Sequence, residues 1–212
     1  MNILETIDLH KTIKGKKVLS NINLDLRGGF VYAFRGENGS GKTMLFRVLS
    51  GLSLPTSGTV TYNGQSFAEG RPGIGVVIEN ASLFPQFTGI QNLSYLASIN
   101  KLASPDDIKE SLIRVGLDPK DKRIVRKYSL GMKQRLLIAQ AIMEKPDFLF
   151  LDEPTNAIDK GGIDLIHEIV KEEKRRGAVV MLASHIDSDV SQLADVCFYM
   201  RNGEIVDEEH NN

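Results

Sequence analysis

The residues of this chain most able to do chemistry lie in one glycine-rich stretch near its start. From Gly36 to Thr43 the sequence reads GENGSGKT, which fits the spacing G-x-x-x-x-G-K-[ST] of a phosphate-binding loop. Glycines let consecutive backbone N–H groups turn toward an anion, Lys42 can reach the β- and γ-phosphates, and Thr43 offers a hydroxyl to Mg²⁺. The expected phosphate-contacting residues are Gly36, Glu37, Asn38, Gly39, Ser40, Gly41, Lys42, Thr43 and Met44.

The segments on either side of this loop are those that a phosphate-binding loop requires. Residues 30–34 (FVYAF) have the pattern of a buried strand, and residues 42–52 carry apolar side chains at helical spacing. A helix that begins at the end of the loop adds the positive end of its dipole to the anion site. This context argues against a chance glycine-rich turn and predicts a nucleotide-binding P-loop.

A second group of candidate residues follows another strand pattern. Residues 148–151 (FLFL) lead directly into Asp152 and Glu153, and ligands of open α/β sheets bind beyond the carboxyl ends of the strands. We expect Asp152 to hold Mg²⁺ directly or through an intervening group, and Glu153 to accept a proton from an attacking water. His185 ends the apolar pattern of residues 179–184 and could contact the γ-phosphate at the same edge.

The rest of the chain predicts the elements that position these residues. Short Val, Ile, Leu and Phe runs without alternation suit strands buried on both faces of a parallel sheet. Ser104 and Pro105 are the N-cap and first residue of one predicted helix. The expected strands are 4–9, 18–26, 30–34, 59–62, 73–79, 148–151, 178–183, 196–200 and 204–206, and the expected helices are 42–52, 90–100, 105–115, 130–143 and 162–175.

These elements predict a single α/β domain. The expected fold class is a P-loop NTPase with a mostly parallel central sheet, an N-terminal antiparallel β portion and a helical subdomain insert. Residues 1–81 and 128–212 would form the core, and residues 82–127 the helical subdomain. The three histidines other than His185, which are His10, His167 and His210, are expected to be structural or exposed; His167 flanks the apolar stripe of its helix.

Composition restricts the possible functions. The chain has 212 residues and a formal net charge of −1, so there is no global positive field to attract nucleic acid. Its one cysteine, Cys197, excludes an internal disulfide and is expected to be buried, since it lies in an apolar run. No segment approaches the ~20 apolar residues that span a bilayer, so a membrane role would need a partner.

Residues 128–135 (YSLGMKQR) stand between the two nucleotide motifs, where one large ATPase family carries an LSGGQ-type signature. With the P-loop and the acidic pair, they make the chain resemble the nucleotide-binding subunit of ATP-binding cassette (ABC) transporters, in the style of small bacterial exporter subunits. The resemblance implies ATP and Mg²⁺ as cofactors and a head-to-tail dimer. In that dimer Ser129 and Gly131, at a helix N-terminus, contact the ATP held by the other subunit's P-loop.

The same resemblance implies roles for residues outside the P-loop. Glu153 matches the catalytic glutamate, His185 the switch histidine, and Asp159 the end of the loop (156–159) that couples the two sites across the dimer. The helical subdomain would contact an integral membrane permease. The chain would then be cytoplasmic and peripheral on the inner face of the cell membrane, paired with a second ABC ATPase subunit as a homo- or heterodimer.

Several positions depart from the family pattern. Glu79 stands where a glutamine usually links Mg²⁺ and the attacking water to the helical insert; its carboxylate can still hold Mg²⁺ but adds negative charge near the phosphates. Ile13 replaces the aromatic residue that stacks on adenine, so stacking is lost and only apolar contact remains. Leu130 and Met132 replace a glycine and a glutamine of the signature, which preserves backbone contacts but changes side-chain contacts.

The preferred hypothesis is an ATP-hydrolysing subunit that powers transport by a separate transmembrane protein, with export favoured. One alternative is a soluble ABC-type switch acting on nucleic acid or ribosomes, but such relatives usually carry two cassettes or a long coiled coil. Another is a P-loop kinase that transfers phosphate to a hydroxyl, against which the signature octapeptide argues. We therefore expect a permease and a second ATPase subunit as partners, and no nucleic acid.

Overall fold

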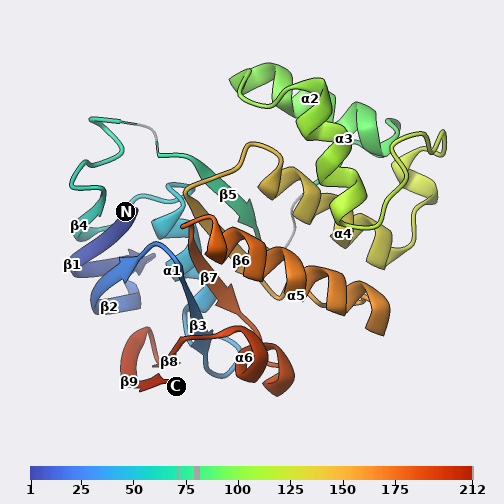
Figure 1. Ribbon diagram of the computed structural model, residues 1–212. Helices are drawn as coiled ribbons and strands as arrows, with labels where there is room; N and C mark the ends of the chain where they lie inside the picture. The colour runs from blue at the N-terminus through green and yellow to red at the C-terminus, as the bar shows by residue number, and fades with distance from the viewer. Residues whose placement is uncertain (71, 79–81, 212) are drawn as a thin grey trace.

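The computed structural model describes residues 1–70, 72–78 and 82–211, and it contains two β-sheets (Figure 1). The smaller sheet is antiparallel, with the order β2-β1-β4. The larger sheet has the order β5-β6-β7-β3-β8-β9; its neighbours are parallel except for the antiparallel pair β8–β9. The strands are β1 (Ile3–Ile13), β2 (Lys16–Arg27), β3 (Phe30–Arg35), β4 (Ser57–Tyr62), β5 (Ile74–Val77), β6 (Phe148–Asp152), β7 (Val179–Ala183), β8 (Val196–Arg201) and β9 (Glu204–His210).

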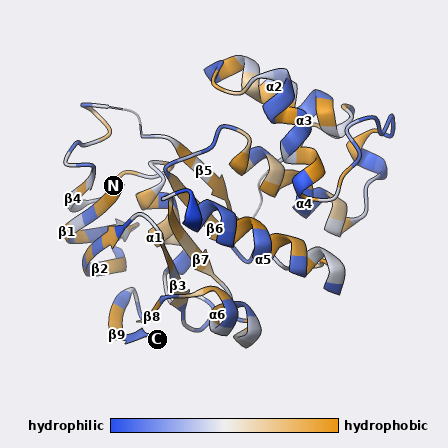
Figure 2. Ribbon diagram, in the orientation of Figure 1, coloured by the Kyte–Doolittle hydropathy of each residue, from blue (hydrophilic) through white to orange (hydrophobic). Residues whose placement is uncertain are grey.

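The central strands β6 and β7 are buried on both faces, as their continuous apolar sequences predict. Successive side chains alternate between two hydrophobic clusters. On β6, Phe148 and Phe150 pack into the cluster shared with the smaller sheet, while Leu149 and Leu151 pack into the cluster shared with the helices. The large sheet is thus the middle layer of the molecule, and its central strands are drawn in hydrophobic colours in Figure 2.

Helix α1 (Lys42–Leu49) packs between the two sheets. Its apolar side chains Leu45, Phe46 and Leu49 are fully buried, and Phe46 contacts the rings of both Phe34 and Phe150. This packing fixes the start of α1, and therefore the P-loop, against the strand ends of β3 and β6.

A group of helices lies to one side of the sheet, at the right in Figure 1, and connects β5 to β6. It consists of α2 (Gly89–Asn100), α3 (Pro105–Arg114), a 3₁₀ turn (Val125–Lys127) and α4 (Leu130–Ile142). Thr88 caps α2 and Ser104 caps α3, each through a capping box. Leu93, Ile108 and Leu136 are buried in one shared cluster, so α4 packs with the two preceding helices as well as with the sheet.

The predicted α/β class, with its N-terminal antiparallel portion and helical insert, is confirmed. Several predicted elements differ in extent; the strand expected over 4–9, for example, runs from Ile3 to Ile13. The helix expected to reach residue 52 ends at Leu49, because Gly51 follows at a φ of 74°. The last strand runs to His210, since β9 pairs with β8 along its length. The strand expected over 73–79 is described from Ile74 to Val77; Glu79 lies outside the described residues.

Two further helices complete the molecule. Helix α5 (Lys160–Arg175) follows β6, and the short helix α6 (Asp187–Leu193), which the sequence did not predict, follows β7. Across the described ranges, none of the helices is long and apolar enough to cross a membrane.

Candidate functional site

The P-loop connects β3 to α1, as predicted, and its shape depends on glycine at two positions. Gly36 has a φ of 151°, and a Cβ there would collide with the carbonyl oxygen of Met200 and the hydroxyl of Ser40. Gly41, at the N-cap of α1, has a φ of 112°. Residues with a side chain rarely adopt these conformations, so the loop can fold back tightly over the helix start only with glycine there. The N-terminus of α1 consequently faces the space inside the loop.

Lys42 folds back across the loop. Its Nζ donates to the carbonyl oxygens of Gly36 at 2.7 Å and Glu37 at 3.1 Å, and lies 3.4 Å from Ser40 Oγ. The side chain is nearly buried, so this ammonium group has exchanged water for loop oxygens. A cation held at this position is a counter-charge for an anion in the loop.

Thr43 and Asp152 meet at the carboxyl end of β6. Thr43 Oγ1 donates to Asp152 Oδ2 at 2.6 Å, joining residues more than a hundred positions apart in sequence. Mg²⁺ is usually held by one or two protein oxygens together with phosphate oxygens and water, and this hydroxyl–carboxylate pair supplies that set. The residues present therefore fit the predicted metal.

Glu153 and His185 form the next pair along the same edge. His185 Nδ1 lies 2.8 Å from Glu153 Oε2, and Glu153 N donates to Ala183 O at 2.8 Å. The Glu153 side chain is 17% exposed and that of His185 65% exposed. Glu153 has a φ of 49°, a strained conformation for a residue with a side chain that is typical of functional sites.

One cavity of about 420 Å³ is lined by Lys42, Thr43, Asp152 and Glu153, while His185 lies outside its lining. It includes two residues that the sequence reasoning missed, Val18 at the start of β2 and Arg47 on α1. Arg47 lies one helical turn after Thr43, a spacing that could have identified it; nothing local marks Val18. The cavity is lined by Val18, Asn38, Gly39, Gly41, Lys42, Thr43, Met44, Arg47, Asp152 and Glu153.

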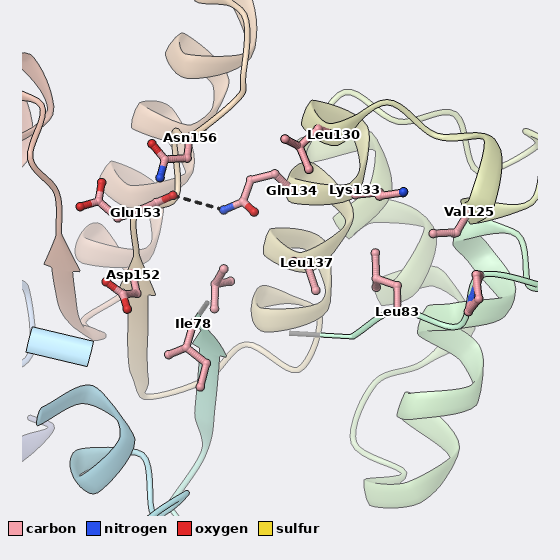
Figure 3. A pocket seen from close by; sticks show the side chains of 12 residues that line it. Ile78, Leu83, Val125, Leu130, Lys133, Gln134, Leu137, Asp152, Glu153 and Asn156 are labelled. Atoms are coloured by element: carbon pink, nitrogen blue, oxygen red, sulfur yellow. Dashed lines mark hydrogen bonds between the residues drawn. The ribbon is translucent and has the colours of Figure 1, made fainter. Parts of the chain in front are cut away.

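A second cavity of similar volume lies between the sheet edge and the N-terminal half of α4 (Figure 3). Asp152 and Glu153 line both cavities. Gln134 reaches across from α4, where its Nε2 lies 3.4 Å from Glu153 O and 3.3 Å from Pro154 O. Gln134 belongs to the signature octapeptide but had no predicted role; it ties that helix to the segment carrying Glu153.

Four predicted site residues outside the P-loop, Ile13, Ser129, Gly131 and Asp159, do not line the P-loop cavity. Ser129 caps α4, with its Oγ accepting from Met132 N at 3.2 Å, and Asp159 caps α5 by accepting from Gly162 N at 3.1 Å. Gly131 packs so closely against Ala157 O that a Cβ would lie 2.8 Å from it. Ile13 is 40% exposed and is not among the described residues lining that cavity.

Sequence comparison agrees with this geometry. The family model described as ABC transporter matches residues 19–156. The chain is 46% identical to the uncharacterized ABC transporter ATP-binding protein YybJ of Bacillus subtilis (strain 168), over 96% of this chain and 94% of that protein. It is 37% identical to the bacitracin transport ATP-binding protein BcrA of Bacillus licheniformis, over 97% of this chain and 68% of that protein. It is 36% identical to the lantibiotic transport ATP-binding protein SrtF of Streptococcus pyogenes, over 96% of this chain and 89% of that protein.

Solved structures share the fold. An ATP-binding subunit of an ABC transporter superposes with a TM-score of 0.89 at 25% identity, covering 98% of this chain and 90% of that chain. A bacterial ABC transporter cassette solved as a dimer also gives a TM-score of 0.89, at 24% identity and 98% coverage of both chains. The chain therefore belongs to the ABC transporter family, as an ATP-binding subunit that hydrolyses ATP.

Proposed function

We propose that this subunit powers the export of a peptide antibiotic through a separate integral membrane permease. Two relatives are named for bacitracin and lantibiotic transport, which supports a peptide substrate. Among the described residues no helix could span a bilayer, so the proposal places the chain at the inner face of the cell membrane, held there by the permease.

Within one subunit, we assign roles from the contacts at the sheet edge. Lys42 and the loop amides would hold the phosphates, and Thr43 and Asp152 would hold Mg²⁺, whose charge would stabilise the negative charge that develops on the phosphates. Glu153 accepts the proton of the attacking water, and His185 orients its carboxylate. The observation that carries this assignment is the 2.8 Å contact of His185 with Glu153, whose side chain lines the same cavity as the Thr43–Asp152 pair.

The ATP site in this proposal is completed by a second ATPase subunit. Ser129 and Gly131 stand at the free N-terminus of α4, outside the lining of the P-loop cavity. A helix N-terminus offers unpaired N–H groups to an anion, so the signature of a facing subunit could contact the γ-phosphate. Asp159 at the start of α5 would lie at the same interface.

Two departures from the family pattern concern nucleotide affinity. Ile13 offers aliphatic contact in place of ring stacking, so we propose weaker binding of adenine than an aromatic residue would give. Glu79 lies outside the described residues; the family resemblance alone implies that its carboxylate adds negative charge near the phosphates and changes the rate or coupling of hydrolysis.

The direct test of the catalytic assignment is Glu153→Gln. We expect steady-state phosphate release to fall by at least ~100-fold, with ATP affinity retained, because the amide cannot accept a proton. Glu168→Gln, in an exposed ion pair on α5, is a matched control that keeps wild-type hydrolysis. Normal hydrolysis by Glu153→Gln would show that another group is the base.

The transport proposal needs its own experiment. The tagged subunit should co-purify from membranes with one integral membrane protein, and the reconstituted pair should move a labelled peptide antibiotic in vesicles when Mg²⁺ and ATP are present. Transport must stop when the subunit carries Glu153→Gln. ATP hydrolysis that is coupled to movement of another class of solute would overturn the substrate assignment.

A further inference from the structure

A cluster of buried polar side chains lies beneath the edge of the large sheet at which Glu153 and His185 meet. We call Thr155, His167, Ser184 and Asp189 the Asp189 cluster. They come from the segment after β6, from α5, from the end of β7 and from α6, and each is at most 5% exposed. A buried carboxylate is costly unless it is fully hydrogen-bonded, so the partners of Asp189 matter for this part of the fold.

Asp189 is the centre of the cluster. Its Oδ2 accepts from Thr155 Oγ1 at 2.6 Å and from Ser184 Oγ at 3.0 Å, and its Oδ1 lies 2.9 Å from His167 Nε2. The other ring nitrogen of His167, Nδ1, lies 3.1 Å from Gln192 Oε1. His167 is therefore held between two α6 side chains, and its ring fixes the orientation of the carboxylate.

The two hydroxyl groups that donate to Asp189 belong to residues close in sequence to Glu153 and His185. Thr155 is two residues after Glu153, and Ser184 directly precedes His185. Ser184 Oγ also accepts from Ile186 N at 3.1 Å, so the segment around His185 is fixed on both sides. One carboxylate oxygen thus joins the two segments whose side chains meet in the 2.8 Å contact between Glu153 and His185.

We propose that Asp189, oriented by His167, is a positioning residue for ATP hydrolysis: it holds Glu153 and His185 at their mutual distance. The inference rests on the roles proposed above for those two residues. A purely structural network predicts lost stability with unchanged turnover of the folded protein. A positioning network predicts a lower kcat with an unchanged KM for ATP, because the phosphate-holding residues are untouched.

The experiment removes one donor at a time with little change in volume. Thr155→Val and Ser184→Ala should each lower kcat roughly 10-fold, since small misplacements of catalytic groups are costly, while KM for ATP stays within about twofold. Asp189→Ala should lower kcat further, and Asp189→Asn should rescue most of it, because its amide oxygen can still accept from both hydroxyls. If Asp189→Ala does not fold, the two single-donor variants still decide the matter.

A matched control lies on α5, the helix that also carries His167. Glu173 of α5 is also buried and paired, with Arg114 at 2.9 Å and Arg176 at 2.7 Å, but it lies at the far end from the catalytic edge. Glu173→Gln should reduce stability and leave kcat unchanged. Unchanged kcat in folded Thr155→Val and Ser184→Ala would overturn the inference.

The roles of Glu153 and His185 are tested separately. If Glu153→Gln abolishes hydrolysis while the Asp189-cluster variants keep wild-type kcat, only the positioning inference fails. If Glu153→Gln itself hydrolyses ATP normally, the proposed function fails instead.

In the Glu153→Gln background, Asp189→Ala should cause no further loss of the residual rate of hydrolysis. A further loss of tenfold or more would contradict a role exerted through Glu153.

Discussion

The P-loop edge of the central sheet and the signature end of α4 differ in how their side chains are partnered. At the P-loop edge, Thr43 bonds to Asp152 and Glu153 contacts His185, each pair joining distant parts of one chain. At the signature end, Ser129 Oγ accepts a hydrogen bond from its own helix, and the neighbouring Leu130 is 69% exposed. The first region is organised by the fold of the subunit, whereas the second faces outward.

This difference indicates that the P-loop and the signature have different roles in the proposed ATP site. A site that must hold phosphates and a metal needs fixed partners, and the core supplies them through strand ends and a helix start. In the proposed dimer the signature end meets its ATP only across the interface, and Ser129 and Gly131 are not among the described residues that line the P-loop cavity of their own chain.

The largest expected effect comes from Lys42→Ala at the P-loop edge. Removing the ammonium group should lower hydrolysis by at least ~100-fold, as loss of a preorganised donor at a developing charge does, and should weaken ATP binding. Lys109→Ala, in an exposed ion pair of α3, is the control. Phosphate release and nucleotide titration measure the two effects; unchanged release by Lys42→Ala would break the contrast.

A smaller effect is expected at the signature end. Ser129→Ala removes an N-cap, which should cost about 1 kcal/mol of stability. Ser104→Ala removes the cap of α3 and should cost a similar amount. Only Ser129→Ala should also lower hydrolysis, about tenfold, because only that helix start meets ATP in the proposed dimer. Equal hydrolysis by the two variants would mean that the signature end has no role beyond folding.

Tighter ATP binding is expected when an aromatic residue replaces Ile13. Ile13→Tyr should tighten ATP binding about two- to tenfold, the range expected for 0.5–1.5 kcal/mol of ring stacking. Ile7→Tyr introduces the same ring at another exposed position of β1 and should leave affinity unchanged. Titration of both variants with ATP measures the effect, and identical affinities would show that Ile13 does not face the base.

The smallest expected effect is on the free energy of unfolding at acid pH, and it comes from Asp107 in the helical insert, away from the P-loop. The hydrogen bond from Lys145, followed by those from Ser104, holds the pKa of Asp107 well below its usual range. The carboxylate therefore stabilises the folded state above the unfolded pKa of about 3.9, and this contribution is lost as pH falls through the lower folded pKa. Urea denaturation from pH 5 to pH 3 should show a steeper loss for the wild type than for Asp107→Asn.

Much of the P-loop edge could be predicted because its residues follow recognisable strand and loop patterns in the local sequence. A strand that ends in Asp152 and Glu153, and a glycine loop that follows another strand, bring these groups to one sheet edge once the strands pair in parallel, as their apolar sequences predict. The same holds for the caps at Ser104 and Ser129, whose hydroxyls act within three residues of their own positions.

Features that depend on packing between distant segments could not be predicted. Helix α6 is short and lacks a strong apolar period, so only its packing in the folded chain indicates it. The charged residues of β9 favour solvent, yet the segment is a strand because β8 offers it a partner. His167 was expected to be structural or exposed and to flank an apolar stripe; its burial against Asp189 of α6 depends on the packing of α5 on α6 and could not be predicted.

The central claim is that the P-loop of one chain and the signature of another form a single ATP site. The most direct measurement mixes chains carrying Asn38→Cys with chains carrying Ser129→Cys, both also Glu153→Gln, and follows disulfide cross-linking. The native Cys197 will not interfere, because burial raises the pKa of its thiol. The account predicts a covalent dimer in the mixture only, and only with Mg²⁺ and ATP. If the mixture binds ATP but gives no covalent dimer, the claim is wrong.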